Sequence, residues 1–379
     1  MSPGFCLERL RLQPWVTVLR VADGLRERGH GVSILTDAGE TFDASGVPVL
    51  RVSTLRPYRF NRVARDINRQ QPDCVVMAIN PTTLAVGTAL FRAIEAPIFA
   101  SFSYPMYSWA EAFHAVRSLG WRRTRAHLRH RLVPDRGAAR LLRRHFSGVF
   151  CQSERTASRL IAAGVPAPKV NAILPGIDVE SFYPDEGRAA SDGSPALLYL
   201  GAASELRGFF QFLDAAVLLA RDHPGAVFRA LLRGATDLQV DEIVRGSIPT
   251  SLRERFTFLG GWLEPSSLRA EISKARAVVL PFVLVPAELP LSVMEALACG
   301  TPVITTNLAG LPNAVGSCGL VVEPGDTQGL FSAMRVLQED KRTRSAIERR
   351  CRAYAEAPRG WLDAVVEWES FLLAGLAHP

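Results

Sequence analysis

The sequence lacks any run of apolar residues long enough to span a membrane. The apolar stretch at residues 277–285 is interrupted by Pro281, whereas a spanning helix needs about 20 consecutive apolar residues. The first residues also lack the apolar core of a secretory signal peptide. We therefore expect a cytoplasmic protein without a transmembrane segment.

Cysteine is scarce and scattered along the chain. The six cysteines form no CxxC motif and no Cys/His spacing typical of a metal site. Several occupy apolar, strand-like segments, where a free thiol behaves as a small hydrophobic side chain. This favours a reducing compartment, and the sequence predicts no metal site. The cysteines are Cys6, Cys74, Cys151, Cys299, Cys318 and Cys351.

Internal repeats, low-complexity segments and nucleic-acid-binding motifs are also absent, so we expect no nucleic-acid partner. The chain does have length and positive charge. Its 379 residues suffice for two domains with full cores, and an apolar content of 48% is typical of a soluble α/β protein. The net charge of +7 is carried by arginine and indicates attraction to anions, such as nucleotide sugars or an anionic lipid surface.

The most informative stretch lies at residues 277–306. Residues 277–285 predict a buried strand, and residues 286–290 a turn. Residues 292–298 suit a helix that stops at Gly300, before a strand that begins near Pro302. The N-terminus of such a helix opens at the carboxyl edge of a parallel sheet, where its N–H groups suit a phosphate. Glu295, about one turn inside, suits sugar hydroxyls; a plain βαβ unit with a solvated glutamate is the alternative.

The run Pro-Leu-Ser-Val-Met-Glu-Ala-Leu-Ala-Cys-Gly-Thr-Pro-Val-Ile at residues 290–304 resembles the donor-binding signature of the retaining family-four glycosyltransferases. The resemblance implies the GT-B fold, in which two Rossmann-like α/β domains face each other across a cleft. In that family two glutamates stand eight positions apart. Glu295 matches the second, which usually holds the ribose of the nucleotide sugar. Ala287 takes the place of the first, and Glu288 lies one position late.

A second part of the resemblance follows the predicted strand at residues 196–200. The family usually has an arginine after the first glycine of this loop and a lysine before the second, and both hold the donor diphosphate. Here Ala202 and Arg207 occupy those positions. Loops after later strands approach the base in relatives, which points to Gly234 and residues 260–263. The expected donor-binding residues are Gly201, Arg207, Glu288, Leu291, Ser292, Val293 and Glu295.

The start of the chain departs from the family pattern. Residues 1–7 leave no room for a full first strand, so we expect either a start codon further upstream, which we favour, or a domain without that strand. Gln13 falls where the family has a pair of glycines. Residues 103–108 follow a predicted strand, and strand ends of open α/β sheets face the ligand crevice. We expect the acceptor near Gln13, Tyr104 and Tyr107.

Residues 117–145, from Arg117 to His145, are strongly basic, with ten arginines against Asp135. The arginines at 136, 140, 143 and 144 share one helical face, while apolar residues lie on another. This pattern suits a helix resting on an anionic membrane surface. A solvated helix face is the alternative. The protein is therefore expected in the cytoplasm, with a peripheral position at the membrane as one interpretation.

The sequence thus predicts three parts. Residues 1–185 form an acceptor-side Rossmann-like domain, residues 186–345 a nucleotide-sugar-binding domain, and residues 346–379 helices that cross back to the first domain. The predicted function is retaining transfer from a nucleotide sugar to a glycan, a lipid-linked or a small-molecule acceptor. No cofactor or metal is expected, because arginine and helix dipoles can stabilise the leaving diphosphate. The alternative is a catalytically impaired relative, and no nucleophile or base can be nominated.

Overall fold

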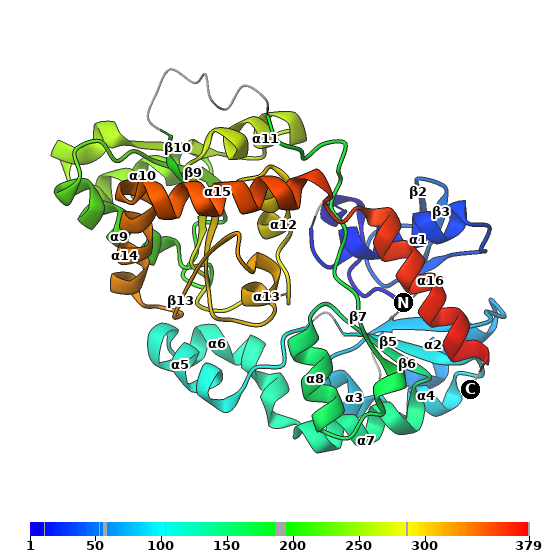
Figure 1. Ribbon diagram of the computed structural model, residues 1–379. Coiled ribbons are helices and arrows are strands. Elements are labelled where there is room, and N and C mark those ends of the chain that lie inside the picture. The colour runs from blue at the N-terminus through cyan, green and yellow to red at the C-terminus, as the bar shows by residue number, and fades with distance from the viewer. Residues whose placement is uncertain are drawn as a thin grey trace.

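The computed structural model describes residues 1–10, 12–52, 54–55, 59–102, 104–185, 195–285 and 287–377. The chain forms two lobes, each built around parallel β-structure with helices outside it (Figure 1). The linker that composition predicted at residues 186–195 lies outside the described residues, except for Pro195.

The second lobe contains a six-stranded parallel sheet in the order β10-β9-β8-β11-β12-β13. Its central strands are almost fully buried, because helices cover both faces of the sheet. The strands are β8 (Leu197–Gly201), β9 (Phe228–Leu232), β10 (Phe256–Gly260), β11 (Ala277–Leu280), β12 (Val303–Thr306) and β13 (Gly319–Val322). The helices are α9 (Phe209–Asp222), α10 (Asp237–Ser247), α11 (Pro265–Lys274), α12 (Leu291–Ala298), α13 (Leu311–Val315), α14 (Thr327–Glu339) and α15 (Lys341–Glu356).

The first lobe contains two smaller sheets. One has the order β1-β3-β2, and the other is the parallel sheet β4-β5-β6-β7. The strands are β1 (Ile34–Thr36), β2 (Phe42–Ala44), β3 (Val47–Arg51), β4 (Val75–Ala78), β5 (Ile98–Phe102), β6 (Gly148–Cys151) and β7 (Val170–Ala172). The helices are α1 (Trp15–Glu27), α2 (Phe60–Asn68), α3 (Pro81–Val86), α4 (Thr88–Ala93), α5 (Trp109–Leu119), α6 (Trp121–Leu128), α7 (Asp135–His145) and α8 (Glu154–Ala162).

Met1 and Ser2 lie between these two sheets. The Met1 ammonium donates to the Val76 carbonyl at 2.5 Å, and the Ser2 N–H donates to the Leu35 carbonyl at 3.0 Å. Residues 1–10 contain a short 3₁₀ helix but no strand, in agreement with the expected gap. Residues 1–2 therefore bridge β1 and β4 where a first strand would join the sheets. Burial lowers the pKa of the Met1 ammonium to about 6.

The last helix, α16 (Trp361–Ala377), packs on the first lobe (Figure 1). Its Trp368 ring stacks on Phe150 of β6 with ring centroids 3.6 Å apart, and Glu369 pairs with Arg28 at 2.6 Å. Aromatic pairs of this kind contribute about 0.5–1.5 kcal/mol beyond the area they bury. The C-terminal helices thus begin on the second lobe, with α15, and end on the first.

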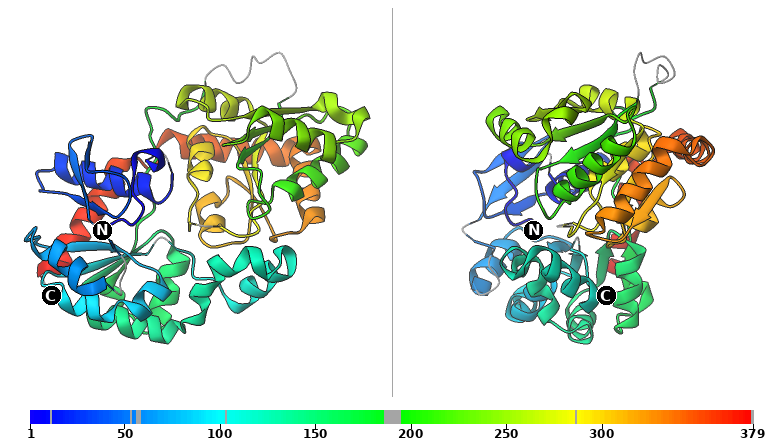
Figure 2. Two further views of the ribbon diagram at one scale, coloured as in Figure 1. Left: turned by 180° about the vertical axis from the view of Figure 1, so that it is seen from behind. Right: turned by 90° about the vertical axis from the view of Figure 1, so that its left-hand side faces the viewer.

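Helices α5 and α6 extend from the first lobe along the second (Figures 1 and 2). Ser108 caps α5 in a reciprocal capping box with Glu111, which fixes where this helix begins. The buried side chains Ala112, Ala115 and Leu119 of α5 belong to the same apolar cluster as the core of the second lobe. The two lobes are therefore held together by apolar packing as well as by polar contacts.

Candidate functional site

The candidate site lies at the carboxyl edge of the six-stranded sheet of the second lobe. The strand order reverses direction between β8 and β11, and ligands of open α/β sheets bind beside such a switch point. Two segments leave the sheet there: the β8–α9 loop (residues 202–208) and the β11–α12 loop (residues 281–285 and 287–290 as described). The loop after β6 of the first lobe meets the same region, so the two lobes face each other across these loops (Figure 1).

Arg207 stands at the end of the β8–α9 loop, as the sequence predicted. Gly201 has φ +144°, and a Cβ there would lie 2.6 Å from an Arg207 Nη1, so the glycine lets the guanidinium approach the strand end. Gly208 has φ +71°, and its Cβ would lie 1.7 Å from the Pro281 carbonyl oxygen. Both glycines are required by the packing of the loop.

The Arg207 guanidinium is half-buried and has no hydrogen-bond acceptor or ion-pair partner among the described residues. It lies 5.5 Å from the Phe282 ring centroid. Burial lowers the pKa of Arg207, and the neighbouring Arg233 adds to that effect, while Tyr199 and Glu295 oppose it. A partly desolvated cation without a partner is stabilised when an anion binds beside it.

Glu295 is buried on α12 and accepts a hydrogen bond from Arg233, with 3.2 Å between Nη2 and Oε2. Arg233 follows β9 directly, and its guanidinium lies 5.6 Å from the ring centroid of the exposed Trp262. The sequence analysis pointed to Gly234 and to residues 260–263 but missed Arg233. The sequence did contain a signal for Arg233. It directly follows a predicted strand and precedes Gly234, and residues at the carboxyl ends of parallel strands lie at the edge of the sheet where ligands bind.

The first turn of α12 brings Leu291, Ser292 and Val293 to the same edge. Gly300 has φ +66° just after this helix, as expected for a residue that closes it. Ser292 is buried, and its hydroxyl oxygen has no hydrogen-bond partner among the described residues. A buried hydroxyl at a helix N-terminus, about one turn before Glu295, adds a polar group to the site.

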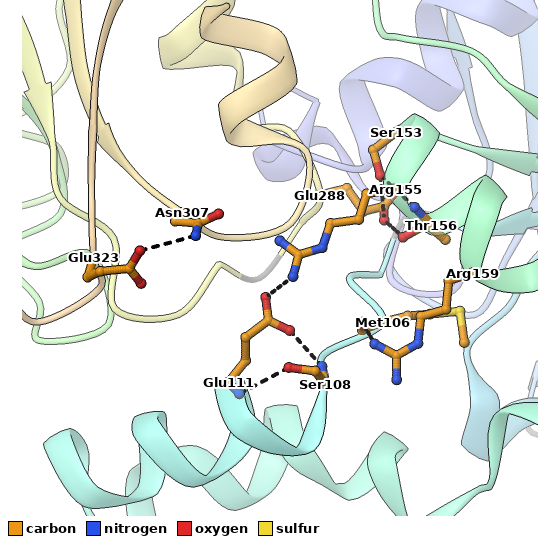
Figure 3. Close-up of polar contacts among 10 residues, drawn as sticks. All are labelled: Met106, Ser108, Glu111, Ser153, Arg155, Thr156, Arg159, Glu288, Asn307 and Glu323. Atoms are coloured by element: carbon orange, nitrogen blue, oxygen red, sulfur yellow. Dashed lines mark hydrogen bonds and ion pairs between the residues drawn. The ribbon is translucent and has the colours of Figure 1, made fainter.

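Glu288 points toward Ser153 and Thr156 at the start of α8 in the first lobe (Figure 3). Its carboxylate is fully buried and accepts hydrogen bonds from the Gln152 N–H at 2.9 Å, the Ser153 hydroxyl at 3.1 Å and the Thr156 hydroxyl. Burial raises the pKa of Glu288 to about 7, although the three hydrogen bonds oppose the shift. Its predicted donor contact therefore stays a prediction that requires the carboxylate to leave α8.

Tyr107 also makes a contact between the lobes. It is buried; its hydroxyl donates to the Val285 carbonyl at 2.5 Å and accepts from the Val285 N–H at 2.9 Å. Burial raises the pKa of Tyr107 well above its usual value. The Tyr107 hydroxyl is thus already bonded to the other lobe. The predicted contact of Tyr107 with the acceptor stays a prediction.

The other two acceptor-side predictions lie elsewhere on the first lobe. The Tyr104 hydroxyl lies 3.2 Å from His127 Nδ1, and its ring meets His130 edge-on with centroids 4.5 Å apart. Gln13 accepts a hydrogen bond from the Thr17 hydroxyl at 2.9 Å, and its Nε2 is buried without a partner among the described atoms. Gln13 and Tyr104 thus have separate partners in these contacts, and their predicted common role at the acceptor stays a prediction.

Within the described ranges, no cluster of three His, Cys, Asp or Glu side chains has a geometry that could hold a metal ion. No helix in the same ranges has both the length and the hydropathy needed to cross a bilayer. All six cysteines are free thiols.

The chain resembles known proteins along most of its length. Residues 15–181 match the family model described as Glycosyltransferase Family 4, and residues 194–340 match the one described as Glycosyl transferases group 1. The glycogen synthase of Mycobacterium tuberculosis (strain CDC 1551 / Oshkosh) is 28% identical over 276 residues. That match covers 72% of this chain and 62% of the relative's own length.

Two solved structures resemble the whole fold. Sucrose-phosphate synthase from Thermosynechococcus elongatus gives a TM-score of 0.73 at 18% identity and covers 96% of this chain and 94% of that one. Anabaena Alr3699/HepE in complex with UDP and glucose gives a TM-score of 0.68 at 18% identity and covers 95% of each chain. At these identities the likeness concerns the fold.

Proposed function

The chain belongs to the GT-B glycosyltransferases described as Glycosyltransferase Family 4 and Glycosyl transferases group 1, and we propose that it transfers a sugar from a nucleotide-sugar donor with retention of configuration. The solved relative with UDP and glucose bound supports a nucleoside diphosphate as the leaving group. A cytoplasmic location and an acceptor that is a glycan, a lipid-linked sugar or a small molecule complete the proposal.

The observation that carries this proposal is the half-buried guanidinium of Arg207, which has no hydrogen-bond or ion-pair partner among the described residues and comes from the same sheet edge as α12. In the proposed complex the diphosphate binds the Arg207 guanidinium and the backbone of Leu291, Ser292 and Val293. It also packs against Gly201. The ribose hydroxyls bind Glu295. These groups come from two loops at one sheet edge, so a single extended anion can reach them all.

Negative charge builds on the diphosphate as the bond to the sugar breaks. A fixed cation and a helix N-terminus aimed at that charge lower the barrier without reorganising during the reaction. We propose that these groups act without a metal ion or a cofactor. The described residues nominate no nucleophile or general base, and the proposal requires no covalent intermediate.

Calorimetric titration with UDP and with GDP tests the donor site. We expect Arg207→Ala to weaken binding roughly 10- to 100-fold, because a charge-assisted hydrogen bond contributes about 1.5–3 kcal/mol. Arg221→Ala removes an exposed arginine of α9 and serves as the control. Equal affinity of the Arg207 variant and the natural protein would place the diphosphate elsewhere.

A second candidate function is a glycosyltransferase-like binding protein without turnover. It is favoured by Ala287 and Ala202, which replace two groups that the family resemblance leads one to expect, and by Glu288, which is occupied at α8. Release of free nucleotide from a panel of nucleotide sugars separates the two. Binding of a nucleotide sugar with no hydrolysis and no transfer to any acceptor supports the second candidate.

We also propose that residues 117–145 rest on an anionic membrane surface, where the protein could reach a lipid-linked acceptor. Nine of the ten arginines in this segment are exposed. Large apolar side chains within this segment and just before it are also exposed, with exposed fractions of 70% for Phe113, 58% for Trp121 and 74% for Leu132. Arginines interleaved with exposed aromatic and apolar side chains fit the interfacial region of a bilayer.

A further inference from the structure

The β11–α12 loop is held by the first lobe at two places. Tyr107, which follows β5, exchanges two hydrogen bonds with the backbone of Val285. Three residues further on, Glu288 accepts hydrogen bonds from Gln152, Ser153 and Thr156 at the start of α8 (Figure 3). Ser153 itself caps α8 through the Thr156 N–H, so Glu288 joins an existing helix cap.

The same loop is tied directly to the loop that carries Arg207. The N–H groups of Val283 and Leu284 both donate to the Leu206 carbonyl at 3.0 Å. On the other side of that loop, Glu205 pairs with Arg123 of α6 at 2.6 Å. Hydrogen bonds at three consecutive residues, Val283 to Val285, therefore connect the first lobe to Leu206, the residue before Arg207.

We propose that Glu288 and Tyr107 are positioning residues that fix the β11–α12 loop, and with it Arg207 and the N-terminus of α12, only when the two lobes are closed. This inference rests on the proposed function, because Arg207 is taken as the diphosphate ligand. Opening of the lobes breaks the five hydrogen bonds of the two side chains and releases the loop. In this arrangement both side chains bond to protein groups, so we assign them a role that acts through Arg207 and α12.

The surroundings of Glu288 make this contact sensitive to pH. In the closed state burial raises the Glu288 pKa to about 7, whereas an exposed glutamate has its usual lower pKa. The closed state thus binds the proton more tightly, so this contribution to closure is full below about pH 4.5 and is lost as pH rises from there to about 7.

Two buried groups that face Glu288 do not ionise over this range. Burial raises the pKa values of Cys151 and Tyr107 well above their usual values, so both stay neutral. Arg155, which also faces Glu288, is paired with Glu111 of α5 at 2.8 Å (Figure 3). The part of a pH effect on closure between about pH 4.5 and about pH 7 that Glu288→Gln removes is therefore assigned to Glu288.

Small-angle X-ray scattering of the full chain without nucleotide tests the inference directly. We expect the natural protein to be more compact at about pH 5 than at about pH 8. Glu288→Gln should stay compact at both, because an amide mimics the protonated acid and can bond the same N–H and hydroxyls. Glu288→Ala and Tyr107→Phe should be expanded at both. Glu242→Ala, an exposed carboxylate on α10, and Tyr354→Phe, whose hydroxyl has no hydrogen bond among the described contacts, are the controls.

Titration with UDP then links closure to the site. Glu288→Ala and Tyr107→Phe should weaken UDP binding at least about fivefold, the lower end of coupling between sites, while Glu288→Gln retains affinity and loses the pH dependence seen in the natural protein. If Glu288→Ala and Tyr107→Phe scatter and bind UDP as the natural protein does, the inference is wrong. If the natural protein binds no nucleoside diphosphate, the proposed function fails, whereas scattering still decides the role of Glu288 in closure. Circular dichroism identifies any variant that does not fold, and Tyr107→Phe, which keeps its buried ring, then decides.

Discussion

Arg233 donates a hydrogen bond to Glu295 across the carboxyl edge of the second lobe's sheet, with Nη2 and Oε2 3.2 Å apart. The two residues come from different βα units, 62 positions apart in sequence. The pair holds the carboxylate predicted to bind ribose, and it places a second guanidinium beside Arg207. The proposed donor site therefore contains two arginines, although the sequence pointed to one.

We expect Arg233→Ala to weaken UDP binding by about tenfold, because Glu295 loses the group that orients it and the diphosphate loses a nearby positive charge. Calorimetry of Arg233→Ala, Glu295→Ala and the double variant measures the coupling. If the two residues act together, the double variant should lose less than the sum of the single losses. Additive losses would mean that each residue contacts the nucleotide independently.

The sequence was sufficient to predict the strands and the helix around this candidate site but not the contacts within it. The apolar, β-branched runs around residues 277–306 predicted a strand, a helix and a strand, and the structure has β11, α12 and β12 there. Patterns within one βα unit report on that unit alone. The pairing of Arg233 with Glu295 depends on which strands are neighbours, and that is a property of the whole sheet.

The direction of Glu288 is a second feature that local sequence could not determine. Its position beside Ala287 suggested a displaced donor carboxylate, whereas the structure directs it to the start of α8 in the other lobe. Which face of a loop a side chain occupies depends on backbone angles and on the partner surface. The packing of α5 along the second lobe was missed for the same reason, because its apolar face is explained equally well by its own lobe.

We expect Gly208→Ala to destabilise the second lobe by about 2 kcal/mol or more, since φ is +71° and the added Cβ would lie 1.7 Å from the Pro281 carbonyl. Gly225→Ala is the matched control, because a Cβ there meets nothing within 4 Å. Urea unfolding followed by circular dichroism compares the two variants. An unchanged midpoint for Gly208→Ala would mean that the β8–α9 loop lies differently from the structure.

Membrane binding by residues 117–145 should depend on charge and on the exposed aromatic side chains. Replacing Arg136, Arg140, Arg143 and Arg144 by Gln removes four charges, each worth on the order of 1 kcal/mol at an anionic surface. We expect sedimentation with phosphatidylserine-containing vesicles to fall steeply in this variant and, for the natural protein, to weaken as salt rises.

The control for this experiment removes four exposed arginines from the second lobe, namely Arg342, Arg349, Arg350 and Arg352. It has the same net charge as the test variant, so a difference between them reports location rather than total charge. Equal loss in both variants would mean that the attraction is a general effect of the basic chain. Trp121→Ala separately tests whether an exposed aromatic ring inserts, and it should weaken binding at high salt as well.

The stacking of Trp368 on Phe150 should determine how firmly α16 is attached to the first lobe. Trp368 is buried, and its ring centroid lies 3.6 Å from that of Phe150, so we expect Trp368→Ala to cost about 3–5 kcal/mol in the free energy of unfolding. Leu373→Ala, on the exposed side of α16, should cost less than about 0.5 kcal/mol. Urea unfolding monitored by circular dichroism measures both. A small loss of stability for Trp368→Ala would show that α16 leaves the first lobe readily in solution. The salt bridge between Arg28 and Glu369 would then be too weak to hold α16 in place, as expected for a partly exposed pair.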